Sequence, residues 1–164
     1  MNEAYYEILV ARKKSQALTM IKLVAAALAV SCVILIFLGF FWGIIPAAVL
    51  GVFSYLMGQK NAVEYEYLYV DKELQIDRII AQSKRKTMDT LDLNELVILA
   101  PVRSHELDRY RNGNYKKADY SSKEEALEAS RYMLIVNDKQ IIFEPTEELV
   151  KTIRMFAPRK VFMY

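Results

Sequence analysis

The feature that most constrains this chain is a long run without charge: the 37 residues from Leu23 to Gln59 contain no Asp, Glu, Lys or Arg. The rest of the 164-residue chain holds all 22 basic and all 20 acidic side chains. An apolar run of this length is typical of membrane-spanning segments, and the charged remainder is typical of a folded aqueous part. The division argues against a soluble monomeric globule.

The uncharged run is too long for one membrane span. As a continuous helix it would extend about 55 Å, whereas the hydrocarbon core is about 30 Å thick. Gly39 and Gly43 interrupt the run, and Pro46 falls in the first turn of a new helix, where proline is tolerated. We therefore predict a two-helix transmembrane hairpin over residues 17–60. Its spans would cover residues 17–38 and 44–58. The alternative is one span followed by one interfacial helix.

Aromatic residues at the expected turn suit the headgroup region, where such side chains are enriched. These membrane-interface candidates are Phe40, Phe41 and Trp42. Basic residues flank the hairpin and are absent from its turn. They are Arg12, Lys13, Lys14, Lys22 and Lys60. The positive-inside rule then predicts a multi-pass protein of the cell membrane with both termini in the cytoplasm.

Residues 1–16 place several apolar or basic side chains at helical spacing. They are Tyr5, Ile8, Leu9 and Arg12. This spacing predicts a short N-terminal helix that lies on the inner membrane face.

Small residues recur at helical spacing in both expected spans. They are Ala25, Ala29, Ala47, Gly51, Ser54 and Gly58. Small side chains let helices approach closely. They would serve contact within the hairpin or contact with a second copy, so a homo-oligomer is one of the expected states.

Residues 61–164 carry 17 basic and 18 acidic side chains and form the expected cytoplasmic domain. Alternation of period two predicts strands over 64–70 and 73–80, joined by a turn at Asp71-Lys72. Further strands are predicted over 83–91, 96–102, 131–136 and 139–143. Pro145 opens a terminal helix whose Leu149, Ile153 and Phe156 share one face. The order predicts an antiparallel β domain followed by one helix, with no doubly wound parallel sheet.

This order of elements after a two-span hairpin resembles the bacterial pleckstrin-homology-like membrane proteins. The resembling segments are 65–70 running into 74–77, the basic strand 84–86 and the helix that starts near 143–145. The resemblance implies a small antiparallel β-barrel closed by its C-terminal helix. The expected fold class is thus an α+β membrane protein with an N-terminal transmembrane hairpin and a pleckstrin-homology-like β-barrel.

The whole chain is similar to an uncharacterised family of small two-span Firmicute membrane proteins, domain of unknown function 6106. The matching segments are 1–7, 83–86, 100–102 with Ser104-His105, and 157–162. This resemblance implies no activity, substrate or catalytic residue.

The residues offer little for catalysis or metal binding. One cysteine and one histidine exclude a disulfide framework and a zinc site with several cysteines. His105 lies beside Ser104 and Asp108, but three loop residues adjacent in sequence rarely form a triad. We expect no catalytic residue, no metal and no cofactor. A minor hydrolase that uses His105 is the less favoured alternative.

Basic clusters are the better candidates for binding lipid or a partner. They are Lys84, Arg85 and Lys86; Arg109, Arg111, Lys116 and Lys117; and Arg159 and Lys160. Basic residues near a membrane attract the anionic inner leaflet. The competing interpretation is that these side chains, interspersed with acids, only solvate the domain.

A stripe of tyrosines occupies alternate positions of the first expected strand. They are Tyr65, Tyr67 and Tyr69. Such a stripe is typical of one wall of a core, and a peptide-binding surface is the alternative.

These features together predict a membrane-anchored, non-enzymatic binding or scaffold module of unknown ligand at the inner membrane face. Its expected partners are the bilayer, anionic lipid headgroups or another membrane protein. Nucleic acid is not expected, because no strongly positive field is evident. The main alternative is a subunit of a membrane transport or stress-response assembly that contacts its partners through the hairpin.

Overall fold

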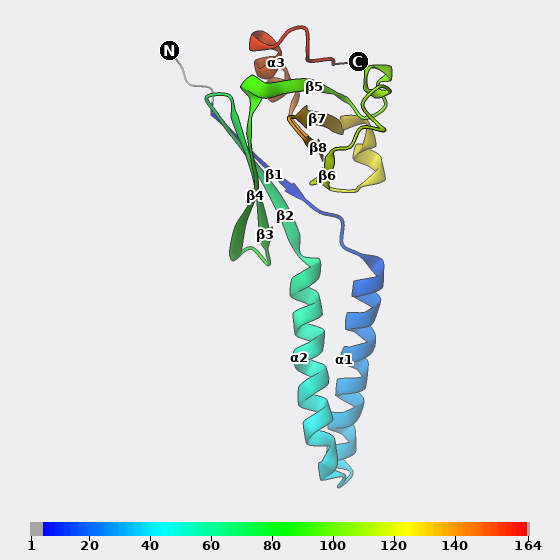
Figure 1. Cartoon of the computed structure of the whole chain (residues 1–164). Coiled ribbons are helices and arrows are strands. Elements are labelled where there is room, and N and C mark those ends of the chain that lie inside the picture. Colours follow the sequence, from blue (N-terminus) through cyan, green and yellow to red (C-terminus); the bar gives the residue numbers. More distant parts are fainter. Residues whose placement is uncertain (1–4, 164) are drawn as a thin grey trace. The chain divides into compact units, whose positions relative to one another are not determined.

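The computed structural model describes residues 5–163, and the chain divides into two compact units. One unit is a helical hairpin that contains Lys14–Val63 and Ile80–Ser83. The other is a β-rich unit that joins the residues up to Lys13 with Glu64–Ile79 and the residues from Lys84 onward. Figure 1 shows the elements of both units in chain order.

The hairpin consists of α1 (Gln16–Phe37), a short 3₁₀ turn (Phe41–Gly43) and α2 (Ile44–Asn61). The expected pair of apolar helices is therefore present, with α2 ending three residues later than predicted. Both helices are long and apolar enough to cross a membrane. Only 6% of the apolar window of each helix is buried, unlike the core helix of a soluble protein. Most apolar side chains of the hairpin are therefore not covered by other residues of the chain.

Small and polar side chains hold α1 against α2. Ala25 and Ser54 are buried between the helices, and the Ser54 hydroxyl donates a hydrogen bond to the Lys22 carbonyl at 3.1 Å. A Cβ on Gly43 would lie 2.9 Å from the Cys32 carbonyl oxygen, so only glycine fits this approach. Gly51 is different, because a Cβ there would meet no atom within 4 Å. Ala25 and Ser54 therefore serve contact within the hairpin, whereas Gly51 lies outside that contact.

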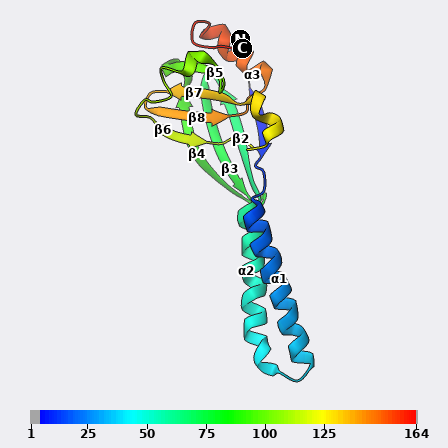
Figure 2. The ribbon, with the colours of Figure 1, turned by 90° about the vertical axis from the view of Figure 1, so that its right-hand side faces the viewer.

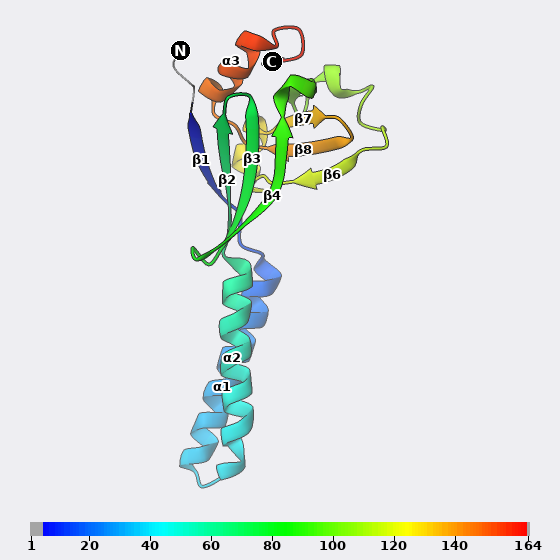
Figure 3. The same cartoon turned by 60° about the vertical axis from the view of Figure 1, so that its left-hand side comes forward.

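Sheet A contains β1 (Tyr6–Ala11), β2 (Val63–Val70), β3 (Glu73–Ile80) and β4 (Lys84–Asp92), hydrogen-bonded in that order. Figure 3 shows these four strands side by side. The two residues of the β2–β3 turn, Asp71 and Lys72, have φ values of 44° and 66°. Positive φ at both positions is the signature of the type I′ turn, whose twist matches the twist of the strands. The prediction of this hairpin, and of the strand over 83–91 after it, is confirmed to within one residue at each end.

The expected N-terminal helix over residues 1–16 is wrong in its described part. Residues 6–11 form β1, which pairs antiparallel with β2, with Tyr6 opposite Tyr69 and Ala11 opposite Glu64. Residues 1–4 lie outside the described part. The spacing of Ile8 and Arg12 also suits a strand that half-buries alternate side chains, and β2 offers a long edge for pairing. The β unit therefore starts before the hairpin, and the expected domain over 61–164 lacks one of its strands.

Sheet B contains β5 (Leu96–Pro101), β7 (Tyr132–Val136), β8 (Lys139–Phe143) and β6 (Lys116–Asp119), in that order. The strands β5, β7 and β8 were predicted, and their bounds differ from the prediction by one residue at two of the six ends. The strand β6 was not predicted, and it pairs parallel with β8 rather than antiparallel. Four residues of mixed polarity give too short a pattern for prediction from sequence.

The two sheets do not close into a barrel, so that expectation is wrong. Each sheet is a separate set of four strands, and a 3₁₀ turn at Leu93–Glu95 carries the chain from β4 in one sheet to β5 in the other. Figure 2 shows the strands of sheet B running across those of sheet A. The core between them is therefore that of two packed sheets.

The tyrosine stripe of β2 forms one wall of that core. Tyr65, Tyr67 and Tyr69 are 3%, 1% and 3% exposed. The Tyr67 ring lies 5.5 Å from the Phe143 ring, and its hydroxyl donates to the Tyr120 carbonyl at 2.7 Å. Burial raises the pKa of Tyr67, because the charged form would lose its hydration. The core interpretation of the stripe is confirmed.

Helix α3 (Glu147–Phe156) packs against the β unit through a short apolar face. The Thr146 side chain caps its first turn by accepting a hydrogen bond from the Leu149 amide. Leu149, Val150 and Ile153 are fully buried, whereas Phe156 is only half-buried. The predicted helix is present, but Phe156 lies at the edge of the buried face rather than in it.

Candidate binding site

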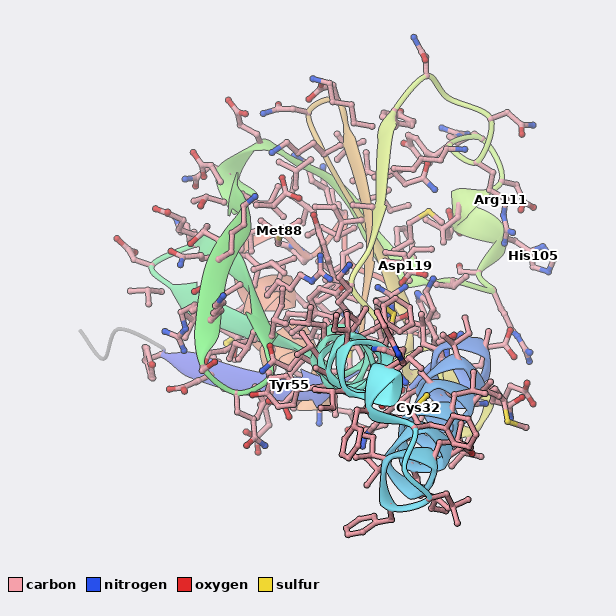
Figure 4. All side chains as sticks on the ribbon, turned by 90° about the horizontal axis from the view of Figure 1, so that it is seen from below. Cys32, Tyr55, Met88, His105, Arg111 and Asp119 are labelled. Carbon is pink, nitrogen blue, oxygen red and sulfur yellow. The ribbon has the colours of Figure 1, made fainter. Side chains whose placement is uncertain are left out.

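The structure does not assemble the triad considered around His105. The His105 side chain is fully exposed, and its Nδ1 lies 3.5 Å from an Asp108 carboxylate oxygen. Figure 4 shows His105 pointing away from the β unit. The Ser104 hydroxyl instead accepts a hydrogen bond from the Glu106 amide at 3.3 Å and so caps a 3₁₀ turn. A local capping role explains Ser104. Within residues 5–163, no group of three or more His, Cys, Asp or Glu residues is arranged to hold a metal ion.

The first basic cluster lies on the edge strand β4, and its members have different environments. Arg85 forms ion pairs with Glu66 and, at 3.7 Å, with Asp77. Glu66 and Asp77 are 4% and 1% exposed, so Arg85 supplies the charge that compensates two buried carboxylates. Lys84 and Lys86 are exposed on the same strand. The three cations are therefore not equivalent, and Arg85 has a structural role.

Glu66 is a buried carboxylate of sheet A whose pKa is raised. Burial raises its pKa; the Arg85 guanidinium opposes this shift, and the nearby Glu7 carboxylate adds to it. The charged form is thus disfavoured in the folded protein despite its ion pair.

Three of the four members of the second basic cluster are engaged by neighbouring groups of the domain. Arg111 binds the Val102 carbonyl at 2.9 Å and Asp108 at 3.2 Å. Lys116 forms a 2.7 Å ion pair with Asp138 across the β6–β8 edge. Their hydrogen bond raises the pKa of Lys116 and lowers that of Asp138. The remaining members are Arg109, which is exposed, and Lys117, which donates to the Arg111 carbonyl at 3.2 Å.

The third cluster differs, because the structure adds a cation that sequence reasoning did not select. Arg159 and Lys160 line a surface cavity of about 330 Å³ together with Lys72 from the β2–β3 turn. The remaining lining residues are Leu93, Asn94, Phe156, Ala157 and Pro158. The lining therefore contains three cations, one amide and an apolar wall, with no carboxylate. We call it the basic cavity.

Contacts within the cavity fix its shape. The Lys72 ammonium lies 5.7 Å from the centre of the Phe156 ring, a cation–π contact. The Leu93 amide donates to the Lys72 carbonyl at 2.8 Å, and the Leu99 amide donates to the Lys160 carbonyl at 2.8 Å. The sequence indicated this site only through Arg159 and Lys160, which form one of the predicted basic clusters. The contact between Phe156 and Lys72 joins two residues that are too far apart in the sequence for their contact to be predicted from it.

Two other cavities in the β unit have a different character. One lies on the outer face of sheet A, where Glu73 and Asp71 supply acidic lining. The other lies beside β1 and the segment 122–130, above the buried Arg131–Glu144 ion pair of 3.1 Å. Neither lining contains a cation, so of these three cavities the basic cavity suits an anionic ligand best.

Two four-stranded sheets, a C-terminal helix and an inserted apolar helical hairpin define the class of the protein as α+β. The chain belongs to the family described as bacterial PH-like domain (DUF6106), whose model matches residues 2–163. The search of curated proteins and the search of solved structures found no match.

Proposed function

We propose that the protein is a membrane-anchored, non-enzymatic module that binds a partner through its PH-like domain at the inner membrane face. The observation that carries this proposal is the pair of helices α1 and α2, whose apolar side chains are almost entirely unburied. Leaving so much apolar surface in water would be very unfavourable, and a bilayer removes it from water.

The connection between the two units supports an anchoring role. The chain leaves the β unit after β1 and returns to it at β2, and these two strands are neighbours in sheet A. The hairpin is therefore an insertion between adjacent strands, with both of its links to the domain at one end of the sheet. Binding that is weak in solution becomes effective when the module is held at a surface, because its local concentration is high.

The charge pattern supports an orientation with both termini in the cytoplasm. Lys14, Lys22 and Lys60 lie at the open end of the hairpin, whereas the turn at 38–43 has no basic residue. The non-enzymatic character is supported by the full exposure of the His105 side chain, which lines none of the three cavities described above.

A cysteine-accessibility scan tests this proposal. Cys32 is the only cysteine and is first changed to serine. Single cysteines are then placed at Asn2, Trp42 and Tyr164, and intact cells are treated with a membrane-impermeant maleimide. We expect labelling at position 42 in intact cells, and labelling at positions 2 and 164 only after the cells are permeabilised. Labelling of position 164 in intact cells would overturn the proposal.

A further inference from the structure

We propose that the basic cavity binds an acidic segment of a partner protein, with carboxylates against its cations and one apolar side chain against Phe156. This inference names the partner chemistry of the binding role proposed above and rests on it. The cavity lies at the β2–β3 turn and the end of α3, wholly within the β unit.

Unpaired charge is the first argument. Ion pairs within 4.0 Å hold many cations of the described residues, among them Arg85, Lys116, Arg131 and Lys139. Within that part of the chain, Lys72, Arg159 and Lys160 form no such pair, and no carboxylate lines the cavity they share. Three like charges around one cavity repel each other, and an incoming anion relieves that repulsion. The cavity therefore selects for negative charge.

Preorganisation is the second argument. The backbone that carries Arg159 and Lys160 is held to β5, because Leu99 donates to Lys160 and accepts from Phe162, each at 2.8 Å. The Lys160 amide also donates to the Ala157 carbonyl at 3.0 Å. Cations carried on a fixed backbone lose less conformational freedom on binding than those of a mobile loop.

The apolar wall is the third argument, because it favours a peptide over a simple anion as the ligand. Phe156 is half-buried, and with Leu93 and Pro158 it forms one side of the cavity. A volume of about 330 Å³ is at the small end of the range for ligand cavities and is sufficient for one large side chain. The Asn94 side chain also lines the cavity; its amide group donates to the Asp92 carboxylate at 2.8 Å, and its carbonyl oxygen suits accepting a hydrogen bond from a peptide backbone.

The position of the cavity along the strand favours a protein partner over lipid headgroups. The chain enters β2 from α2 at Val63, and the turn with Lys72 follows Val70 at the other end of this strand. Eight extended residues span about 25 Å. The cavity is therefore at the end of the strand remote from the covalent link to the helices.

Peptide binding to the full chain in phosphatidylcholine nanodiscs tests the inference. The probe is a short fluorescein-labelled peptide of alternating glutamate and phenylalanine, followed by fluorescence anisotropy. Two control peptides carry glutamine for glutamate and alanine for phenylalanine. The test protein carries Lys72→Gln, Arg159→Gln and Lys160→Gln. Its matched control carries Lys84→Gln, Lys86→Gln and Arg109→Gln, which remove the same charge from exposed positions outside the cavity.

We expect the cavity variant to bind the acidic peptide at least about tenfold more weakly, since three ion pairs of modest strength exceed the 1.4 kcal/mol of a tenfold change. The control variant should bind within about twofold of wild type, and both control peptides should bind more weakly than the acidic one. Equal losses in the two variants, or no binding of the acidic peptide, would overturn the inference. Cavity-dependent binding to phosphatidylglycerol vesicles in place of the peptide would also overturn it and assign the site to lipid. The labelling pattern of the accessibility scan does not depend on this cavity, so failure of either proposal is recognised separately.

Discussion

Ala11 lies directly opposite Glu64 in the antiparallel pairing of β1 with β2, although the whole helical hairpin separates them in sequence. A turn of two residues, placed after the next residue of each strand, would therefore be enough to connect β1 directly to β2. We predict that replacing residues 13–62 by Asn-Gly gives a water-soluble protein that retains both sheets. Far-ultraviolet circular dichroism and a cooperative urea transition would show this.

The control is residues 64–164 alone, which lack β1. This fragment loses the Tyr6–Tyr69 ring contact at 6.1 Å and the Arg12 hydrogen bond to the Tyr65 hydroxyl at 2.9 Å. It also exposes the edge of β2, so we expect lower stability and aggregation. Equal stability of the fragment and the joined protein would contradict the structural role assigned to β1.

We predict that α3 contributes to the stability of the β unit mainly through its fully buried residues. Leu149→Ala should lower the free energy of unfolding by about 2–5 kcal/mol, because it leaves a cavity in the core. Phe156→Ala should cost less than about 1.5 kcal/mol, because this ring is only half-buried. Met155→Ala is the control on the exposed face and should change stability by less than about 0.5 kcal/mol. Urea unfolding followed by tyrosine circular dichroism measures all three, and a larger loss from Phe156→Ala than from Leu149→Ala would refute this order.

The approach of the two helices at Gly43 gives a prediction for the hairpin. Gly43→Ala should destabilise it by about 1–3 kcal/mol, because the new Cβ would meet the Cys32 carbonyl oxygen at 2.9 Å. Gly51→Ala should be tolerated, since nothing lies within 4 Å of the added group. Trp42 is the only tryptophan and is next to Gly43, so its fluorescence during denaturation in mild detergent reports on the turn. The same midpoint for both variants would show that the close approach is unimportant.

Glu66 gives a prediction with a defined pH dependence. Burial raises its folded-state pKa above the unfolded value, so its contribution favours folding most at pH values below the unfolded pKa. That contribution is lost as the pH rises through the folded pKa. Glu66→Gln should therefore increase stability relative to wild type at pH 7, and the difference should diminish at pH 4. Urea unfolding at the two pH values measures the difference.

The control for Glu66 is Glu73→Gln, which removes an exposed carboxylate from the neighbouring strand β3. Its effect on stability should be small at both pH values. A loss of stability in Glu66→Gln at pH 7 would mean that the ion pair with Arg85 outweighs the cost of burying the carboxylate.

The sequence by itself determined the elements whose signal is local. An uncharged run broken at Gly39 and Gly43 predicts two helices, because hydrophobic composition and helix-breaking residues act within a few turns. Alternation along β2 likewise placed Tyr65 and Tyr67 in the core, since residues two apart share one face of a strand. Both features are present in the structure.

Only the tertiary structure decided which distant segments meet. The N-terminal residues suit a helix or a strand, and pairing with β2 decided for the strand. The short strand β6 exists because β8 offers it a parallel edge. Lys72 joins Arg159 and Lys160 because the β2–β3 turn reaches the end of α3. These outcomes depend on contacts between residues far apart in the chain. A local periodicity carries no information about the free energy of such contacts.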